Sequence, residues 1–132
     1  MYKVVVVEDE SMVRKGIILT IDWSALDCVV VGDAANGEEG VELVDRLKPD
    51  IVVSDVKMPR MDGVEMIEQL RKQGCKAKFI ILTAYSDFKY AQSALRLGVS
   101  DYLLKPLKDG ELEGAVRKIL SVVEVGTTQA EE

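Results

Sequence analysis

Acidic side chains gather where two apolar runs of the chain end. The run 4–7 consists of four valines and is followed by the acidic triplet 8–10, and the run 51–53 is followed, one residue later, by Asp55. Continuous β-branched runs of this kind are typical of strands in a parallel sheet that is buried on both faces. Chemistry in open parallel sheets collects at the carboxyl ends of the strands, so we expect these carboxylates to converge.

A hydroxyl and an amine follow two further apolar runs. Thr83 comes directly after the run 79–82, and Lys105 comes directly after the run 102–104. If all four runs are parallel strands, carboxylates, one hydroxyl and one amine meet at one edge of the sheet. The sequence therefore predicts a polar site built from four separate strands.

Each of these groups also has a purely structural explanation. Glu8 and Asp9 can complement the positive start of a following helix. Asp55 can be an ordinary turn residue, Thr83 can be a structural hydroxyl, and Lys105 can be a solvated strand end. The joint placement favours a site, because independent structural reasons rarely bring every group to the same edge.

The acid cluster predicts a divalent cation. Carboxylates that share a pocket repel one another, which raises the pKa of at least one of them. Mg²⁺ removes this conflict, and it prefers oxygen ligands. The acidic loop would repel the phosphate of a flavin or nucleotide, and neither glycine-rich phosphate motif, GxxxxGK[ST] or GxGxxG, occurs in the chain. The absence of histidine excludes histidine-based mechanisms and most transition-metal sites.

The elements that position these groups alternate along the chain. Stretches with helical apolar spacing separate the strand-like runs, and they are centred on 13–17, 41–47, 64–70, 88–95 and 112–123. Asn36 with Glu39 and Asp62 with Glu65 are typical of capping boxes that open helices. We predict an α/β fold: a doubly wound (βα)5 chain with an open five-stranded parallel sheet and helices on both faces.

Length and composition narrow the class of protein. A chain of 132 residues is expected to form one domain, here 1–123, and the polar segment 124–132 is expected to be a frayed tail or a linker stub. The net charge of -6 argues against nucleic-acid binding by this domain. Two cysteines are too few for a disulfide scaffold, so we expect reduced thiols in a cytoplasmic protein. We expect no membrane span, since no apolar run is long enough.

Four ordered motifs resemble those of the receiver domains of response regulators in bacterial two-component signalling. The motifs are VEDE, VSDVKMPRMDG, ILTA and LGVSDYLLKP, at 7–10, 53–63, 81–84 and 97–106. The resemblance extends from about residue 2 to 123 and implies the flavodoxin-like receiver fold. The segment 22–24 resembles receivers attached to AraC-type helix-turn-helix domains.

The resemblance implies a role for each acid. Asp55 is then the phosphoryl acceptor, and Asp9 ligates Mg²⁺ directly, together with Asp55 and the backbone carbonyl of Lys57. Glu8 matches the other member of the acidic pair, which in this family usually reaches the metal through water. Many family members carry aspartate at the position of Glu8, so the longer side chain changes the contact geometry but not the charge.

The resemblance also implies the parts of a switch. Thr83 is the switch hydroxyl, Lys105 is the phosphate-binding amine, and Tyr102 is the switch aromatic, whose alternative role is that of a half-buried packing residue. The peptide between Lys105 and Pro106 is expected to be cis. Lys57 and Tyr85 occupy positions that tune how fast water reaches the phosphoryl group.

The function implied is a phosphorylation-activated signalling switch. A sensor histidine kinase supplies the phosphoryl group, and the domain catalyses only its own phosphorylation and dephosphorylation. The output is expected to be transcription regulation through a carboxyl-terminal DNA-binding domain; the alternative is a stand-alone receiver that works by docking. A homodimer through the fourth helix, fifth strand and fifth helix and an unphosphorylated monomer are equally compatible with the sequence. Two other readings are an aspartate-nucleophile phosphatase, disfavoured because Lys57 stands where its second acid belongs, and an interaction domain with an inert acid cluster.

Overall fold

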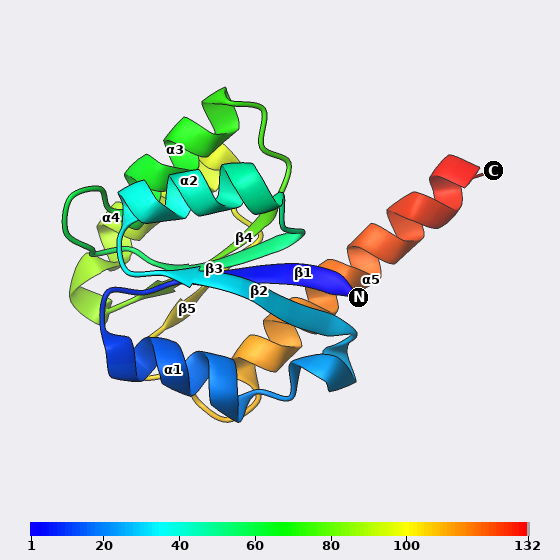
Figure 1. Cartoon of the computed structure of the whole chain (residues 1–132), viewed down its shortest axis with the longest axis horizontal. Coiled ribbons are helices and arrows are strands. Elements are labelled where there is room, and N and C mark those ends of the chain that lie inside the picture. Colours follow the sequence, from blue (N-terminus) through cyan, green and yellow to red (C-terminus); the bar gives the residue numbers. More distant parts are fainter. Residues whose placement is uncertain (132) are drawn as a thin grey trace.

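The chain alternates strands and helices from end to end (Figure 1). The computed structural model describes the backbone of residues 1–131, and the side chains of all of these except Tyr85 and 124–131. The elements are β1 (Tyr2–Val7), α1 (Ser11–Thr20), η1 (Trp23–Leu26), β2 (Cys28–Ala34), α2 (Gly37–Leu47), β3 (Ile51–Asp55), α3 (Gly63–Lys72), β4 (Lys78–Thr83), η2 (Tyr85–Asp87), α4 (Phe88–Gln92), η3 (Ser93–Leu97), β5 (Asp101–Leu104) and α5 (Glu111–Glu131), where η marks a 3-10 helix.

All five strands are parallel and follow the order β2-β1-β3-β4-β5. The register pairs Val7 with Ser54 across β1 and β3, and Asp55 with Leu82 across β3 and β4. Thr83 pairs with Leu104 across β4 and β5. The carboxyl ends of four adjacent strands therefore stop at nearly the same level, which confirms the predicted doubly wound (βα)5 sheet.

Helices cover both faces of the sheet. In Figure 1, α2, α3 and α4 lie on one face, and α1 and α5 lie on the other. The alternation of strand side chains explains this arrangement: Val5 and Val7 belong to the first apolar cluster, whereas Val4 and Val6 belong to the second. All four valines are fully buried, as expected for a strand covered on both sides.

The helix starts near the site are capped by side chains. Asp62 and Glu65 form the predicted reciprocal capping box at α3. Asn36 accepts a hydrogen bond from the Glu39 backbone N–H at 2.9 Å, but the Glu39 carboxylate accepts from Ala35, one residue before the cap. The capping box predicted for Asn36 and Glu39 is therefore only half formed.

The fourth helical segment differs from the prediction. In place of one helix there are two 3-10 turns, η2 and η3, on either side of the five-residue α4. The hydroxyl of Ser93 donates to the carbonyl of Tyr90 at 2.6 Å, which competes with regular helical bonding at this point. The segment ends at Gly98, where a φ of 77° suits glycine, as the sequence indicated.

The last helix is longer than the apolar stripe predicted. The backbone of α5 is helical to Glu131, beyond the predicted domain boundary at 123, and the assignment of 124–132 as a tail or a linker stub stays a prediction. Within the described part of the chain, no helix combines the length and apolarity needed to cross a membrane.

Candidate functional site

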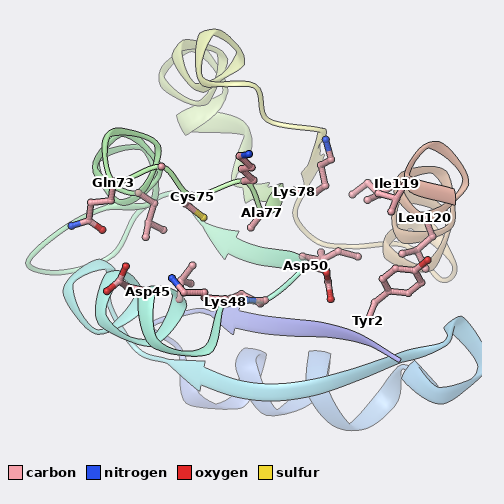
Figure 2. A pocket seen from close by; sticks show the side chains of 17 residues that line it. Tyr2, Asp45, Lys48, Asp50, Gln73, Cys75, Ala77, Lys78, Ile119 and Leu120 are labelled. Atoms are coloured by element: carbon pink, nitrogen blue, oxygen red, sulfur yellow. The ribbon is translucent and has the colours of Figure 1, made fainter. Parts of the chain in front are cut away.

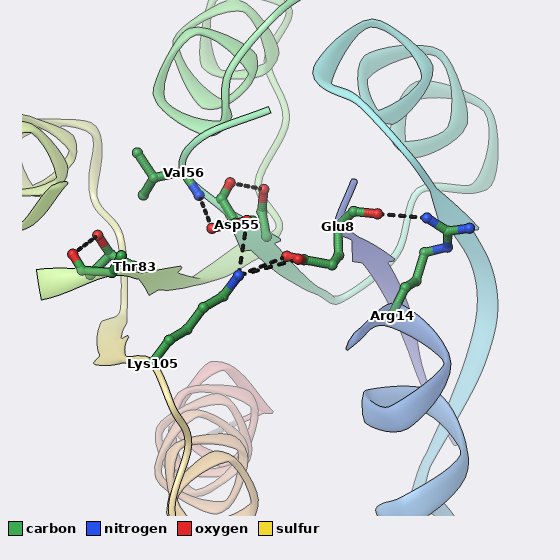
Figure 3. Close-up of polar contacts among 8 residues, drawn as sticks. Glu8, Arg14, Asp55, Val56, Thr83 and Lys105 are labelled. Atoms are coloured by element: carbon green, nitrogen blue, oxygen red, sulfur yellow. Dashed lines mark hydrogen bonds and ion pairs between the residues drawn. The ribbon is translucent and has the colours of Figure 1, made fainter. Parts of the chain in front are cut away.

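The predicted polar groups meet at the carboxyl edge of the sheet (Figure 3). The ammonium of Lys105, which follows β5, lies 2.9 Å from Oδ2 of Asp55 and 3.2 Å from each carboxylate oxygen of Glu8. Glu8 follows β1, and Asp55 ends β3. One amine therefore bridges acids that come from two neighbouring strands.

Three carboxylates form a compact group at this edge. Glu8, Asp9 and Asp55 each offer one oxygen, and these oxygens lie within 4.8 Å of one another. Glu8 is fully buried and Asp55 is 7% exposed, whereas Asp9 is exposed. This donor set, hard oxygens with one side open to solvent, suits a small divalent cation that keeps some of its water.

The charges of the cluster are strongly perturbed. Burial, together with a hydrogen bond to Asp55 and the Asp55 charge, raises the pKa of Glu8 to about 7, and Lys105 opposes this rise. Burial by itself lowers the pKa of Lys105, but hydrogen bonds and charges from Asp55 and Glu8 outweigh it and leave the pKa above its ordinary value. The site therefore holds more negative charge than Lys105 alone neutralises.

Local structure fixes the position of Asp55. Its Oδ1 accepts a hydrogen bond from the Val56 backbone N–H at 2.8 Å, and its carbonyl accepts one from the Ser54 hydroxyl at 2.8 Å. Gly63, at the start of α3, donates its N–H to the Val56 carbonyl at 2.8 Å. A Cβ at Gly63 would overlap the carbonyl oxygen of Asp55, so only glycine lets α3 begin this close to the strand end.

Thr83 and Lys105 are tied together by the backbone. The N–H of Lys105 donates to the Thr83 carbonyl at 2.9 Å, and the buried Thr83 hydroxyl donates to the Ala84 carbonyl at 3.1 Å. The peptide between Lys105 and Pro106 is cis, as predicted. The hydroxyl is thus held in a weak local hydrogen bond beside the strand that carries the amine (Figure 3).

The residues predicted to switch and tune lie around this edge. Tyr102 is half-buried, and its ring packs edge-to-face against Phe88 with centroids 5.3 Å apart. The ammonium of Lys57 is exposed and lies 3.9 Å from a carboxylate oxygen of Asp87. The side chain of Tyr85 lies outside the described residues, so its predicted role stays a prediction.

Sequence reasoning missed Arg14. Its Nη1 donates to the backbone carbonyl of Glu8 at 2.6 Å (Figure 3). Its Nε donates to Asp33 Oδ2 at 2.8 Å. A contact between a side chain and a distant backbone carbonyl leaves no periodic signal. The only indication was a basic residue one turn into the helix that follows the acidic loop.

A separate hollow lies at the opposite edge of the sheet. It has a volume of about 430 Å³ and is lined by Asp50 before β3, by Lys78 at the start of β4, and by Ile119 and Leu120 of α5 (Figure 2). Its charged groups are of both signs and include Asp45 and Lys48 at the end of α2 and Lys78 at the start of β4. It is therefore distinct from the acid cluster.

A family model decides what kind of domain carries this site. The model described as the response regulator receiver domain matches residues 4–117. The chain belongs to the receiver domain family of response regulators. This confirms the predicted resemblance, and the domain is accordingly a signal-transduction module of two-component systems rather than a conventional enzyme.

Relatives of this receiver domain include proteins named as transcriptional regulators. It is 36% identical over 121 residues to the transcriptional regulatory protein YesN of Bacillus subtilis. The matched region covers 92% of this chain and 33% of YesN. It is 34% identical over 113 residues to the transcriptional regulatory protein HptR of Staphylococcus aureus. The matched region covers 86% of this chain and 44% of HptR. The chain thus spans less than half the length of these relatives.

Solved structures agree with the fold of this receiver domain. The REC domain of AraT, a response regulator from Geobacillus stearothermophilus, is 38% identical, with a TM-score of 0.90 over 96% of this chain and 98% of that one. A two-component transcriptional regulator AraC from Clostridium phytofermentans is 28% identical, with a TM-score of 0.84 over 93% of this chain and 95% of that one.

Proposed function

We propose that this receiver domain accepts a phosphoryl group on Asp55 from a sensor histidine kinase, in a reaction that needs Mg²⁺. The observation that carries the proposal is the contact between Asp55 and Lys105 at 2.9 Å, beside a compact group of three carboxylates. Asp55 is 7% exposed, so its carboxylate is accessible from one direction only.

The residues that would hold Mg²⁺ are Glu8, Asp9 and Asp55, with the backbone carbonyl of Lys57. When bound, the ion would neutralise the acids and the incoming phosphoryl oxygens. The donor set fits because the acids lie within 4.8 Å of one another and carry more charge than Lys105 balances.

The chain's own groups position and neutralise the phosphoryl group. A carboxylate oxygen of Asp55 attacks phosphorus; the new P–O bond forms as the bond to the donor nitrogen breaks, and the donor imidazole keeps the electron pair. Lys105 neutralises a phosphoryl oxygen, and the Thr83 hydroxyl donates a hydrogen bond to another. Phosphoryl transfer depends mainly on such positioning and charge neutralisation.

A conformational switch follows from the same contacts. To reach the phosphoryl oxygens, the Thr83 hydroxyl gives up its weak hydrogen bond of 3.1 Å to the Ala84 carbonyl. This movement opens space for Tyr102, which then turns inward and leaves its edge-to-face contact with Phe88. Phosphorylation adds about two negative charges, which are the local event that drives the change. Lys57 and Tyr85 tune the lifetime of the phosphoryl group.

The output that we propose is transcription regulation by a longer protein located in the cytoplasm. Support comes from the relatives, since YesN and HptR are named transcriptional regulatory proteins and the chain covers 33% and 44% of their lengths. Homodimerisation through α4, β5 and α5 belongs to the same proposal. Exposed apolar side chains on these elements support it, because Tyr90 of α4, Leu104 of β5 and Val122 of α5 are 41%, 41% and 68% exposed.

The proposal is tested by mass spectrometry of the intact protein. The domain is incubated with acetyl phosphate and Mg²⁺, and we expect one phosphate adduct that is absent from Asp55→Asn and from samples with EDTA. Asp109→Asn is the matched control, because Asp109 is an exposed acid in the loop before α5. An adduct that persists in Asp55→Asn, or that forms equally well in EDTA, would overturn the proposal.

A further inference from the structure

The side chain of Arg14 joins the loop after β1 to strand β2, beside the acid cluster. Arg14 lies in α1, and its guanidinium reaches back to the Glu8 carbonyl at 2.6 Å and across to Asp33 on β2 at 2.8 Å. The side chain of Arg14 is 16% exposed and that of Asp33 is 46% exposed, so the hydrogen bond to the Glu8 carbonyl is the better shielded of the two. Figure 3 shows the guanidinium on the opposite side of Glu8 from Lys105.

The start of α1 lacks the usual local support. Glu10 occupies the N-cap position but makes no capping hydrogen bond with its side chain. The loop is held from one side by the Glu8 N–H, which donates to the Ala34 carbonyl at 3.0 Å. Arg14 holds the loop from the other side by donating a hydrogen bond to the carbonyl of Glu8.

We propose that Arg14 is a positioning residue for the cation site: it fixes the peptide that joins Glu8 to Asp9, so that both carboxylates face Asp55. The Glu8 carbonyl belongs to that peptide, and any rotation of the peptide moves both acids. This inference rests on the proposed Mg²⁺ site. Arg14 contacts the acid cluster through the backbone carbonyl of Glu8 and not through a carboxylate of the cluster.

The effect of Arg14 is geometric. The pKa of Glu8 is governed by burial, Asp55 and Lys105, and the charge of Arg14 is already paired with Asp33. A guanidinium presents several N–H donors in a rigid fork, which lets one side chain hold two segments at a fixed separation. A lysine at this position keeps the charge but loses the fork.

The test measures Mg²⁺ binding directly, by calorimetric titration of the metal into the whole domain. We expect Arg14→Gln to weaken Mg²⁺ binding by about tenfold, which is typical when a residue that orients a metal ligand is removed. Arg14→Lys is expected to bind Mg²⁺ more weakly than the wild type despite its charge. Arg117→Gln is the matched control, because Arg117 is exposed on α5 and its loss changes the net charge equally.

A second measurement separates positioning from loss of folding. The Mg²⁺ concentration that gives half-maximal phosphorylation by acetyl phosphate is expected to rise in Arg14→Gln, while the rate at saturating Mg²⁺ stays the same. Circular dichroism checks that each variant is folded. If Arg14→Gln does not fold, Arg14→Lys carries the test.

The outcomes distinguish this inference from the proposed function. Wild-type protein that neither binds Mg²⁺ nor takes up phosphate removes the proposed function, and the inference with it. Wild-type protein that binds Mg²⁺, with Arg14→Gln or Arg14→Lys equal to it in affinity, overturns the inference alone.

Discussion

The ammonium of Lys105 lies 2.9 Å from Oδ2 of Asp55, although 50 positions separate the two residues and β4 lies between their strands. The same ammonium contacts both carboxylate oxygens of Glu8 at 3.2 Å. Without a divalent cation, Lys105 is therefore the cation that holds the acids of β1 and β3 together. It occupies the place where the amine is needed when a phosphoryl group arrives.

Replacing Lys105 with methionine is expected to destabilise the metal-free protein. The change keeps most of the side-chain stem but leaves Glu8 and Asp55 facing each other without a counter-charge. We expect a loss of about 1–3 kcal/mol in the free energy of unfolding at pH 8, measured by urea denaturation in EDTA. The loss should shrink when Mg²⁺ is added.

Lys72→Met is the control for this experiment. Lys72 forms an exposed pair with Glu68 at 3.4 Å within α3, and such pairs contribute only about 0.3–0.5 kcal/mol. If Lys105→Met unfolds at the same urea concentration as Lys72→Met, the bridge between the acids does not stabilise the fold.

The raised pKa of Glu8 predicts a pH dependence of stability. Folding raises this pKa from 4.5 to about 7, so the folded protein binds the proton more tightly than the unfolded chain does. The contribution of Glu8 to stability is therefore complete below pH 4.5 and is lost as pH rises through 7. A shift of this size corresponds to a contribution on the order of 3 kcal/mol.

Glu8→Gln tests this dependence. In metal-free buffer, the free energy of unfolding of the wild type should fall between pH 5 and pH 8 by more than that of Glu8→Gln. The variant should also be the more stable of the two at pH 8, because it removes the cost of burying the Glu8 charge and, in addition, the repulsion with Asp55. Parallel pH profiles, measured by thermal unfolding, would contradict the assignment of this titration to Glu8.

Much of the site could be predicted because strand ends carry positional information. Glu8, Asp55, Thr83 and Lys105 all follow apolar runs, and parallel pairing then places them at one edge whatever the details of the loops. The side-chain contact between Lys105 and Asp55 is consistent with this reasoning, although β4 lies between their strands.

Features that depend on single contacts could not be predicted. The contact of Arg14 with the Glu8 carbonyl involves a backbone acceptor, which every residue has, so no pattern of side chains marks it. The division of the fourth helical segment depends on local bonds such as that from Ser93 to Tyr90. Apolar spacing over so short a stretch does not separate an α-helix from 3-10 turns.

Gly63→Ala is expected to damage both the fold and the site. The new Cβ would overlap the Asp55 carbonyl and lie 3.2 Å from the Ser54 hydroxyl, so α3 or the acidic strand end must move. We expect a loss of about 3 kcal/mol or more in the free energy of unfolding, together with a reduced rate of phosphate uptake. Gly114→Ala is the matched control, because no atom lies within 4 Å of its Cβ position on α5. That change should stabilise the protein by about 0.5–1 kcal/mol; equal effects at the two glycines would contradict the crowding at Asp55.

Tyr90 ties α4 to the loop that carries the site. Its hydroxyl donates to Asp62 Oδ2 at 2.6 Å, while Oδ1 of the same carboxylate caps the Glu65 N–H at 2.9 Å. Burial and this hydrogen bond raise the pKa of the Tyr90 phenol above its ordinary value, so it stays a hydrogen-bond donor even in alkaline solution. Tyr90→Phe should therefore cost about 1 kcal/mol and speed amide exchange in α4. Asp62→Asn keeps a capping oxygen for the Glu65 N–H. The double-mutant cycle of Asp62→Asn with Tyr90→Phe therefore isolates the hydrogen bond between Tyr90 and Asp62. A coupling free energy of zero would show that these two residues do not hold α4 in place.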